Sequence, residues 1–528
     1  MRRQERVKTI VKLLVLSVAA VMAGGVQARP TAGSDGKGPA PVDFVSAAPQ
    51  GFGDRQNSVA WSMAWWRGKL YVGTARSGHC VQRATTFFYY PGLKGVLPLD
   101  PDIECEENPY DLPLQAEIWR WTPETNVWDR VFQSPNDVPI PDPDNPGQSL
   151  PGKVVARDIG FRGMIGFTEP DGTEALYVAG VSSRSFNPWA PPPRILRSTD
   201  GETFMPLPQD PGTFLGDIQA AGFRSLAAYK GRLYVTASAG LLGHGVLLES
   251  GDPVGGNDTF RQVTPPDMTL YEINAFNGYL YLGGGNRTQP YTIWKTDATG
   301  WPYTFRPVVT EAAYHPGQSR AVVSMREFQG RLYIGTDAPA EVLRINPDDT
   351  WDLVVGASRD TPAGRKEPLS GMDVGFNWQW NLHIWRMGVH KEVLYIGTYD
   401  ASTNLRATPG LGQVLAPMMG FDLFASRDGV TFSPITRTGF GDKFSVGVRT
   451  FASTPYGLFV GDANGFYGLH IWREVARGGS DPGMPGGTDG YRTYIPFVMA
   501  DDNVVSAMGQ ERIDAVDRGE WSRQLVVQ

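Results

Sequence analysis

Cysteine, histidine and long apolar runs are all scarce in this chain. Its 528 residues include 2 cysteines and 6 histidines, which excludes a cysteine-rich disulfide scaffold. No segment after residue 28 has the roughly 18 consecutive apolar residues of a membrane span. The sequence also lacks a Gly-x-Ser-x-Gly elbow, a His-Glu-x-x-His pair, a phosphate loop and a Cys-x-x-Cys-His haem site. No standard catalytic signature therefore identifies an activity or a cofactor.

Positive charge is also in deficit. The formal net charge is −7, and removal of residues 1–28, which hold five basic residues and one acidic residue, makes it −11. Nucleic acids and anionic membranes bind basic surfaces, where counterion release supplies the free energy. We therefore expect neither as the main partner, although a local basic patch remains open.

The first 28 residues have the pattern of a secretory signal peptide. Four basic residues among the first eight precede an apolar run over 13–22, and Val26-Gln-Ala28 supplies small residues for cleavage. The Arg2-Arg3 pair permits twin-arginine export, but the residues after it favour the general secretory route. We expect a secreted or periplasmic protein.

One phrase recurs seven times, with the general form Leu-Tyr-Val-Gly-Thr. The copies lie at 70–74, 176–180, 233–237, 280–284, 332–336, 394–398 and 458–462. From the second copy on, the spacing averages about 56 residues, which indicates a solenoid, a propeller or an array. The repeat overrides the several domains that the length alone suggests.

Each copy belongs to a unit of four short β-rich segments. An apolar stretch and a turn precede the phrase, as at 322–330, and a segment such as Thr292-Ile-Trp-Lys295 follows it. A fourth segment, such as Trp351-Asp-Leu-Val-Val355, ends the unit. Because turn residues separate the segments, the unit predicts a four-stranded antiparallel meander.

We therefore predict an all-β fold, a seven-bladed β-propeller of four-stranded antiparallel blades over residues 58–486. The strands are apolar at consecutive positions, which indicates sheets packed on both faces, as in radially stacked blades. A linear solenoid is the alternative, although its repeats are usually shorter. A strand at 42–52, in the N-terminal extension 29–57, or at 490–500, in the C-terminal tail 487–528, is expected to complete the last sheet.

Two turns carry a resemblance. Residues 198–204 (Ser-Thr-Asp-Gly-Glu-Thr-Phe) and 426–432 (Ser-Arg-Asp-Gly-Val-Thr-Phe) are similar to the Asp-box hairpin, although each is one residue shorter. With the repeated phrase, they make the chain resemble secreted bacterial β-propellers with Kelch-like or Asp-box-like blades. The resemblance implies the fold and the compartment. Such propellers include lectins, sialidases and scaffolds, so it does not choose an activity.

Cys80 and Cys105 both lie in the insertion 75–116. In an oxidising compartment, a lone pair at this separation predicts one disulfide. The alternative is two metal thiolates, but the pair lacks the close spacing of zinc or haem sites. Two further insertions, 133–152 and 356–377, are predicted to be loops that carry binding groups.

Arginines recur where the first strand of a unit is expected to begin. Arg162, Arg224 and Arg449 occupy equivalent positions, and Arg320 and Arg386 are near equivalents. Guanidinium groups that converge at the channel mouth would bind a carboxylate or phosphate in a bidentate manner. The competing hypothesis is that they brace neighbouring blades by pairing with the acids after the second strands. Those acids are Asp337, Asp400 and Asp462.

Two further side-chain groups are candidates. Trp378 and Trp380 suit stacking on sugar rings if they face solvent, and packing between blades is the alternative. Histidines expected on the same face are His79, His244, His315 and His383. Four imidazoles can hold iron, copper or zinc, but independent surface histidines are the favoured interpretation, so we predict no metal site.

The sequence thus favours a monomeric propeller that binds an extracellular carbohydrate or acidic polymer at its channel-mouth face. One alternative is a glycan-active hydrolase or lyase that acts on the same ligands; sialidase chemistry would need an arginine triad, a tyrosine nucleophile and an acid. Another is a scaffold that binds envelope proteins.

Overall fold

The computed structural model describes residues 42–476, except for 90–99, 101, 107, 143, 146, 188–189, 239–244, 266–267, 286–288, 318, 320 and 409. The described residues all belong to one compact unit. The predicted signal peptide 1–28 and the strand expected at 490–500 lie outside them.

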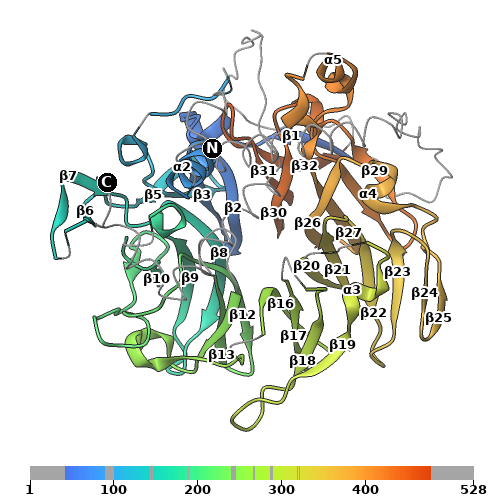
Figure 1. Ribbon diagram of the computed structural model, residues 1–528, viewed down its shortest axis with the longest axis horizontal. Coiled ribbons are helices and arrows are strands. Elements are labelled where there is room, and N and C mark those ends of the chain that lie inside the picture. Colours follow the sequence, from blue (N-terminus) through green and yellow to red (C-terminus); the bar gives the residue numbers. More distant parts are fainter. Residues whose placement is uncertain are drawn as a thin grey trace, which may run out of the picture. The chain divides into compact units, whose positions relative to one another are not determined.

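The described residues form antiparallel meanders of four strands each, and the fold is therefore all-β (Figure 1). The first meander consists of β2 (Asn57–Trp66), β3 (Lys69–Arg76), β4 (Glu117–Thr122) and β5 (Val127–Gln133). The second consists of β8 (Gly160–Thr168), β9 (Glu174–Val181), β10 (Ile195–Ser198) and β11 (Met205–Pro206).

The same pattern continues along the chain. The next two meanders are β12 (Gly222–Tyr229), β13 (Arg232–Ser238), β14 (Gly245–Ser250) and β15 (Phe260–Gln262), then β16 (Leu270–Phe276), β17 (Tyr279–Gly284), β18 (Ile293–Thr296) and β19 (Arg306–Val309). They are followed by β20 (Ala321–Phe328), β21 (Arg331–Asp337), β22 (Val342–Ile345) and β23 (Trp351–Val355), then β26 (Asn381–His390), β27 (Val393–Asp400), β28 (Leu423–Ser426) and β29 (Ser433–Thr436).

The last meander takes its fourth strand from the start of the described chain. Its first three strands are β30 (Gly447–Thr454), β31 (Gly457–Ala463) and β32 (Ile471–Ala476). β1 (Val42–Ser46) pairs antiparallel with β32, with Val42 opposite Ala476 and Ser46 opposite Trp472 (Figure 1). The N-terminal extension thus covers the edge that β32 would otherwise expose.

Successive sheets touch along their first strands. Contacts join β2 to β8, β8 to β12, β12 to β16, β16 to β20, β20 to β26 and β26 to β30. β30 also contacts β2, and Val59 of β2 pairs with Ala463 of β31. Sheets that meet face to face in chain order make the fold β-propeller-like.

The recurring phrase forms the second strand of the sheets, where it supplies the core. Leu70, Leu176 and the leucines of the later copies are fully buried. The aromatic ring that follows each leucine is buried too, and the hydroxyls of Tyr234, Tyr281 and Tyr395 reach the next sheet. Tyr281 donates to Asp349 at 3.1 Å, and Tyr395 donates to Glu474 at 3.3 Å. Consecutive positions are apolar because both faces of each sheet are covered.

The two turns at 198–204 and 426–432 have the same hydrogen bonds. Asp200 Oδ1 accepts from the backbone N–H groups of Glu202 and Thr203, both at 2.8 Å, and from the hydroxyl of Ser198. These donors hold the pKa of Asp200 below its usual range. Gly201 has φ +76°, and a Cβ there would lie 1.9 Å from the hydroxyl oxygen of Tyr71 in the preceding sheet. Only glycine fits this position.

The two insertions that we predicted to be loops contain β-hairpins. β6 (Val138–Pro141) pairs with β7 (Ser149–Val155), and β24 (Arg359–Thr361) pairs with β25 (Gly364–Lys366). The prediction was wrong because prolines at 139 and 141 suggested an irregular segment, whereas an isolated hairpin has edge positions where proline loses no ladder bond. Ile140 between them is fully buried.

Helices occupy connections only. The α-helices are α2 (Gly78–Tyr89), α3 (Glu311–Tyr314), α4 (Val374–Asn377) and α5 (Leu411–Leu415). The 3₁₀ turns are η1 (Gln50–Gly53), η3 (Pro109–Asp111), η4 (Ser183–Ser185), η5 (Pro253–Gly255), η6 (Asn257–Thr259), η7 (Ala401–Leu405), η8 (Ala416–Met418) and η9 (Gly439–Gly441). None of the described helices has the length and apolar character of a membrane span.

Candidate functional site

Every first strand contains a β-bulge near its start. In β8, Phe161 pairs with Gly180 and Gly163 pairs with Ala179, which leaves Arg162 as the extra residue. In β30, Val448 and Thr450 face consecutive residues, so Arg449 is the extra residue. A bulge changes the direction of the side chain that it adds. Arg162 and Arg449 therefore do not follow the alternation of side chains along their strands.

The bulge positions of the first strands carry arginines and aromatic residues almost exclusively. We call these residues the bulge set: Trp61, Arg162, Arg224, Tyr271, Val323, Trp385 and Arg449. In β12 the irregularity spans Arg224 and Ser225. Residues at equivalent places on touching strands lie together, so the bulge set forms one group.

Each arginine of the bulge set stacks on an aromatic ring from a neighbouring sheet. The Arg162 guanidinium lies 5.1 Å from the ring centre of Trp61, and that of Arg449 lies 4.9 Å from the ring centre of Trp385. Arg224 lies 5.3 Å from the ring centre of Tyr271. Such contacts hold the guanidinium plane by one face and leave the N–H groups at its edge for other acceptors.

Among the described residues, Glu272 pairs with two arginines, Arg224 of the bulge set and Arg386. It accepts from Arg386 at 2.8 Å and from the Ser225 hydroxyl at 2.8 Å. The Nε of Arg224 lies 4.0 Å from the same carboxylate. Glu272 directly follows the bulge residue of β16, and Arg386 directly follows the bulge residue of β26.

We call Arg162, Arg224, Arg386, Arg449 and Glu272 the arginine cluster. Arg449 is 1% exposed, and its Nε and Nη1 have no hydrogen-bond partner among the described residues. Burial and the positive charges of Arg162, Arg386 and Arg224 lower the pKa of Arg449. Burial and the charges of Arg224 and Arg386 likewise lower the pKa of Arg162. Of these four guanidinium groups, those of Arg224 and Arg386 lie within 4.0 Å of the Glu272 carboxylate, and Asp337 also acts on the charge of Arg224.

The acids after the second strands have other partners. Asp337 lies 2.6 Å from the His383 ring nitrogen. Asp400 accepts from the N–H of Ser402, and Asp462 accepts from the Ser445 hydroxyl at 2.7 Å. Asp400 and Asp462 thus bind residues outside the arginine cluster, whereas the charge of Asp337 also acts on Arg224.

Arg320 and His244 lie outside the described residues. The other candidates from the sequence are not part of the arginine cluster. Trp378 is 1% exposed, and its indole N–H donates to Asp400 at 3.2 Å. Trp380 is partly buried and packs with Trp378 against Leu411 and Leu415 of α5. Trp378 is therefore a core residue that no sugar ring can reach.

The three described histidines of the predicted set have different neighbours. His79 packs on Phe466, with ring centres 4.5 Å apart, and burial together with the charge of Arg406 lowers its pKa to about 4. His315 lies 3.9 Å from Glu341, and His383 lies beside Asp337. No group of three or more metal-binding side chains occurs among the described residues.

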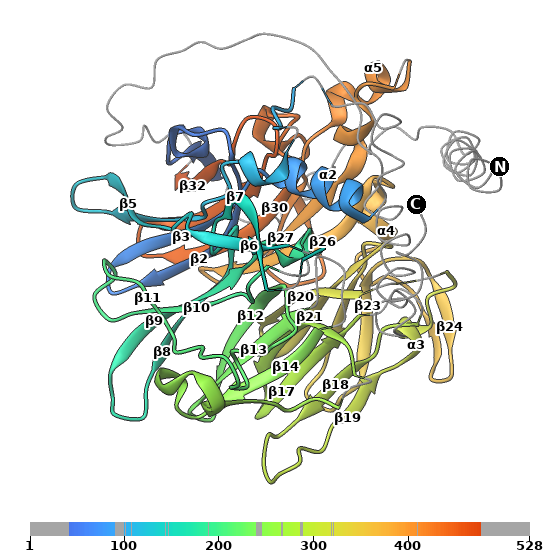
Figure 2. The same ribbon diagram turned by 60° about the vertical axis from the view of Figure 1, so that its left-hand side comes forward.

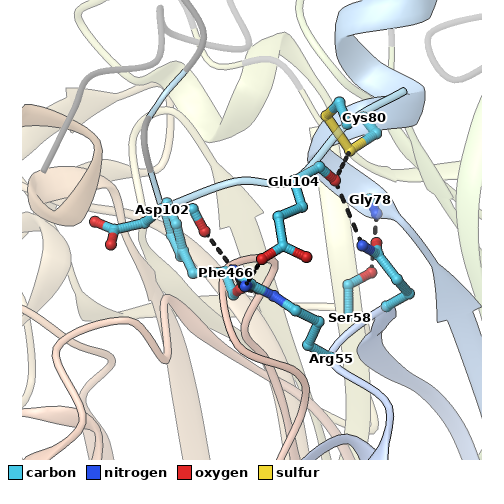
Figure 3. The surroundings of a disulfide bond; sticks show 9 residues. Arg55, Ser58, Gly78, Cys80, Asp102, Glu104 and Phe466 are labelled. Atoms are coloured by element: carbon cyan, nitrogen blue, oxygen red, sulfur yellow. Dashed lines mark hydrogen bonds and ion pairs between the residues drawn. A yellow bond between two sulfur atoms is a disulfide. The ribbon is translucent and has the colours of Figure 1, made fainter. Parts of the chain in front are cut away.

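Cys80 and Cys105 form the predicted disulfide, with Cα atoms 5.4 Å apart (Figure 3). The bond joins α2 to the later part of the insertion. Nearby, Arg55 donates to the backbone oxygens of Asp102 and Phe466, both at 2.6 Å, and pairs with Glu104 at 2.6 Å. These contacts tie the insertion to the last sheet. The disulfide is typical of proteins from oxidising compartments.

Comparisons with known proteins give no family. No protein-family model and no curated protein matches the chain. Among solved structures, PorZ, a surface component of the type-IX secretion system of Porphyromonas gingivalis, has 13% identity and a TM-score of 0.45 over 80% of this chain and 47% of that one. A puromycin-hydrolysing peptidase of Mycobacterium tuberculosis has 8% identity and a TM-score of 0.41 over 81% and 51%. This chain therefore spans about half the length of either protein, and likenesses this weak say nothing about its activity.

Proposed function

We propose that this chain is a secreted or periplasmic, closed seven-bladed β-propeller that binds an extracellular anionic ligand at its arginine cluster. The contacts of each first strand with the next, including β30 with β2, support a closed ring. The pairing of β1 with β32 supports closure by the N-terminal strand.

The imbalance of charge in the arginine cluster carries this proposal. A buried charge without a partner costs several kcal/mol, so folded proteins pair or solvate such groups. Glu272 neutralises one positive charge and contacts Arg386 most closely. Arg162 and Arg449 have no ion pair or hydrogen bond through their side chains among the described residues, and stacking leaves their N–H edges available. An anion bound between them would supply the missing partner.

The chemistry of the donors defines the ligand class. Guanidinium groups donate paired N–H bonds to carboxylate, phosphate and sulfate groups. The carboxylate of an acidic carbohydrate meets this requirement, and so does the end of another acidic polymer. A neutral sugar does not, because Trp378 is buried and the exposed stacking surface that the sequence suggested is missing there.

Replacement of Arg449 tests the proposal. We expect galacturonate oligosaccharides to bind the protein and matched neutral oligosaccharides to fail, in a calorimetric titration at low ionic strength. Arg449→Gln should weaken binding by roughly 10- to 100-fold, because a charged hydrogen bond contributes about 1.5–3 kcal/mol. Arg365→Gln is the matched control, since Arg365 pairs with Asp360 and Glu367 at an exposed hairpin. Equal affinities of the two variants, or no preference for acidic ligands, would contradict the proposal.

A glycan-active hydrolase is a second candidate function. Tyr271 lies beside Arg224, and Glu272 follows it in the chain. A phenol next to a carboxylate among several arginines would suit cleavage of an acidic sugar. Product analysis of the same titration mixtures separates binding from turnover.

A further inference from the structure

One end of the arginine cluster is covered by the insertion that carries the disulfide. Cys80 and Val81 of α2 belong to one buried apolar cluster with Trp61 and Trp385, the rings on which Arg162 and Arg449 stack. Val155 of β7 belongs to the same cluster, and Figure 2 shows α2 beside β7. This covered end is the one at which the first strands begin.

Ion pairs hold the cover in place. Asp100 is fully buried on the insertion, and both of its carboxylate oxygens accept from Nη2 of Arg406 at 2.6 Å. Arg406 follows η7, so the bond joins the insertion of the first sheet to the connection between β27 and β28. Tyr467 adds a hydrogen bond to Asp102 at 2.6 Å. These contacts fix the described part of the insertion beside the end of the first strands where Trp61 and Trp385 lie.

The opposite end of the first strands has a different lining. Three residues beyond each bulge position stand Ala64, Ile165, Ala227, Asn274, Arg326, Gly388 and Ala452. Most of these side chains are small, and Arg326 is the charged one among them. A pocket of about 580 Å³ opens here, lined by Asn274, Ala275, Arg326, Glu327, Val389 and Glu392, with others. Glu392 belongs to the turn between β26 and β27, which places the pocket at the hairpin end.

Arg326 connects this pocket with the arginine cluster. Its side chain is accessible to solvent at the pocket. Arg326 stands three residues beyond Val323, whose carbonyl oxygen accepts from Nη2 of Arg224 at 3.4 Å, so one short stretch of β20 joins the pocket to the arginine cluster. Glu327 and Glu392 line the same pocket, so two carboxylates accompany Arg326 at the opening.

We propose that the ligand reaches the arginine cluster through the hairpin-end pocket, past Arg326, and that it is a small multivalent oxyanion or the acidic end of a chain. The proposal rests on the proposed function. The insertion packs beside the other end of the cluster, whereas the pocket at the hairpin end is wide enough for a terminal carboxylate or a phosphate. Arg326 is a positioning residue that draws the anion past the two glutamates.

Association kinetics test the route. The probe is inorganic pyrophosphate, and binding is followed by stopped-flow tryptophan fluorescence, because Trp61 and Trp385 stack on the binding arginines. Electrostatic steering changes association rates by 10-fold or more at low ionic strength. We expect Arg326→Gln to slow association about tenfold and Glu392→Gln to accelerate it severalfold, and both effects should shrink as salt is added. Ala275→Trp should slow association and dissociation together, with little change in the dissociation constant.

Two controls separate this inference from the proposed function. Reduction of the Cys80–Cys105 disulfide should leave the association rate unchanged if the ligand enters at the hairpin end. If reduction accelerates association while Arg326→Gln and Ala275→Trp have no effect, the ligand enters through the covered end and the route is wrong, although anion binding stands. If pyrophosphate and galacturonate oligomers both fail to bind, the proposed function fails and the route falls with it. Galacturonate oligomers that bind when pyrophosphate does not would identify the acidic chain end as the ligand.

Discussion

Replacing Arg406 by methionine is expected to lower the free energy of unfolding by about 3–5 kcal/mol, the usual cost of removing one partner of a buried ion pair. Arg406 is 5% exposed and pairs with Asp100, which is fully buried, and with Asp102, which is 6% exposed, so methionine leaves two carboxylates without this counter-charge. The guanidinium also lies 4.2 Å from the ring centre of Phe466, a contact that methionine replaces in part. Chemical denaturation of the two proteins at neutral pH measures the difference.

The matched double variant identifies the cause of this loss. When Asp100→Asn is combined with Arg406→Met, the fully buried carboxylate is neutralised and Asp102 alone keeps a charge beside residue 406, so part of the lost stability should return. A double variant as unstable as Arg406→Met alone would show that packing, rather than the uncompensated carboxylate, determines the cost.

Removing β1 is expected to destabilise the protein by about 4 kcal/mol or more, which combines lost apolar burial with lost hydrogen bonds. A chain that begins at residue 49 loses the strand that pairs with β32. It also loses Phe44, which stacks on Phe440 with ring centres 5.1 Å apart, and Ala47, whose carbonyl accepts from Trp128 at 2.6 Å. Scanning calorimetry should show a lower melting temperature.

A chain that begins at Val42 is the control for this truncation, because it keeps the whole strand. We expect its melting temperature to match that of the longer protein. If the chain that begins at residue 49 melts at the same temperature as the control, β1 does not complete the last sheet in solution, and closure by the N-terminal strand is wrong.

The sequence predicts the sheets well because their pattern is local. Leu176, Leu233 and their equivalents are buried from both sides, so the chain repeats the same apolar phrase wherever a second strand must form. Turn residues between the segments then specify the meander. The hairpin of β6 and β7 escaped prediction because Pro139 and Pro141 argue against a central strand, whereas an edge strand or a bulge tolerates them.

The candidate site is only partly visible in the sequence. Arg162, Arg224 and Arg449 stand out because they share one place in the repeat. Their aromatic neighbours do not, since a bulge shifts the register and breaks the alternation by which a strand is recognised. Aligning the starts of the first strands would have placed Trp61, Tyr271 and Trp385 beside the arginines.

The burial of each candidate side chain and the identity of its partners depend on residues that are distant in the sequence, so no local pattern predicts them. Glu272 is the shared carboxylate because β16 and β26 bring it to Arg386, 114 residues away in the chain. Trp378 has the composition of a stacking residue, but its indole lies in the core against α5. Long-range packing of this kind depends on how the sheets meet.

The most direct test of an anion at the arginine cluster is an anomalous diffraction map of crystals soaked in selenate. We predict a selenium peak within hydrogen-bonding distance of the Arg162 and Arg449 guanidinium groups in the wild-type protein. The same peak should be lost in Arg449→Gln crystals, while any selenate at the protein surface remains. Selenate found only at surface sites in wild-type crystals, with the arginine cluster empty, would contradict the proposal.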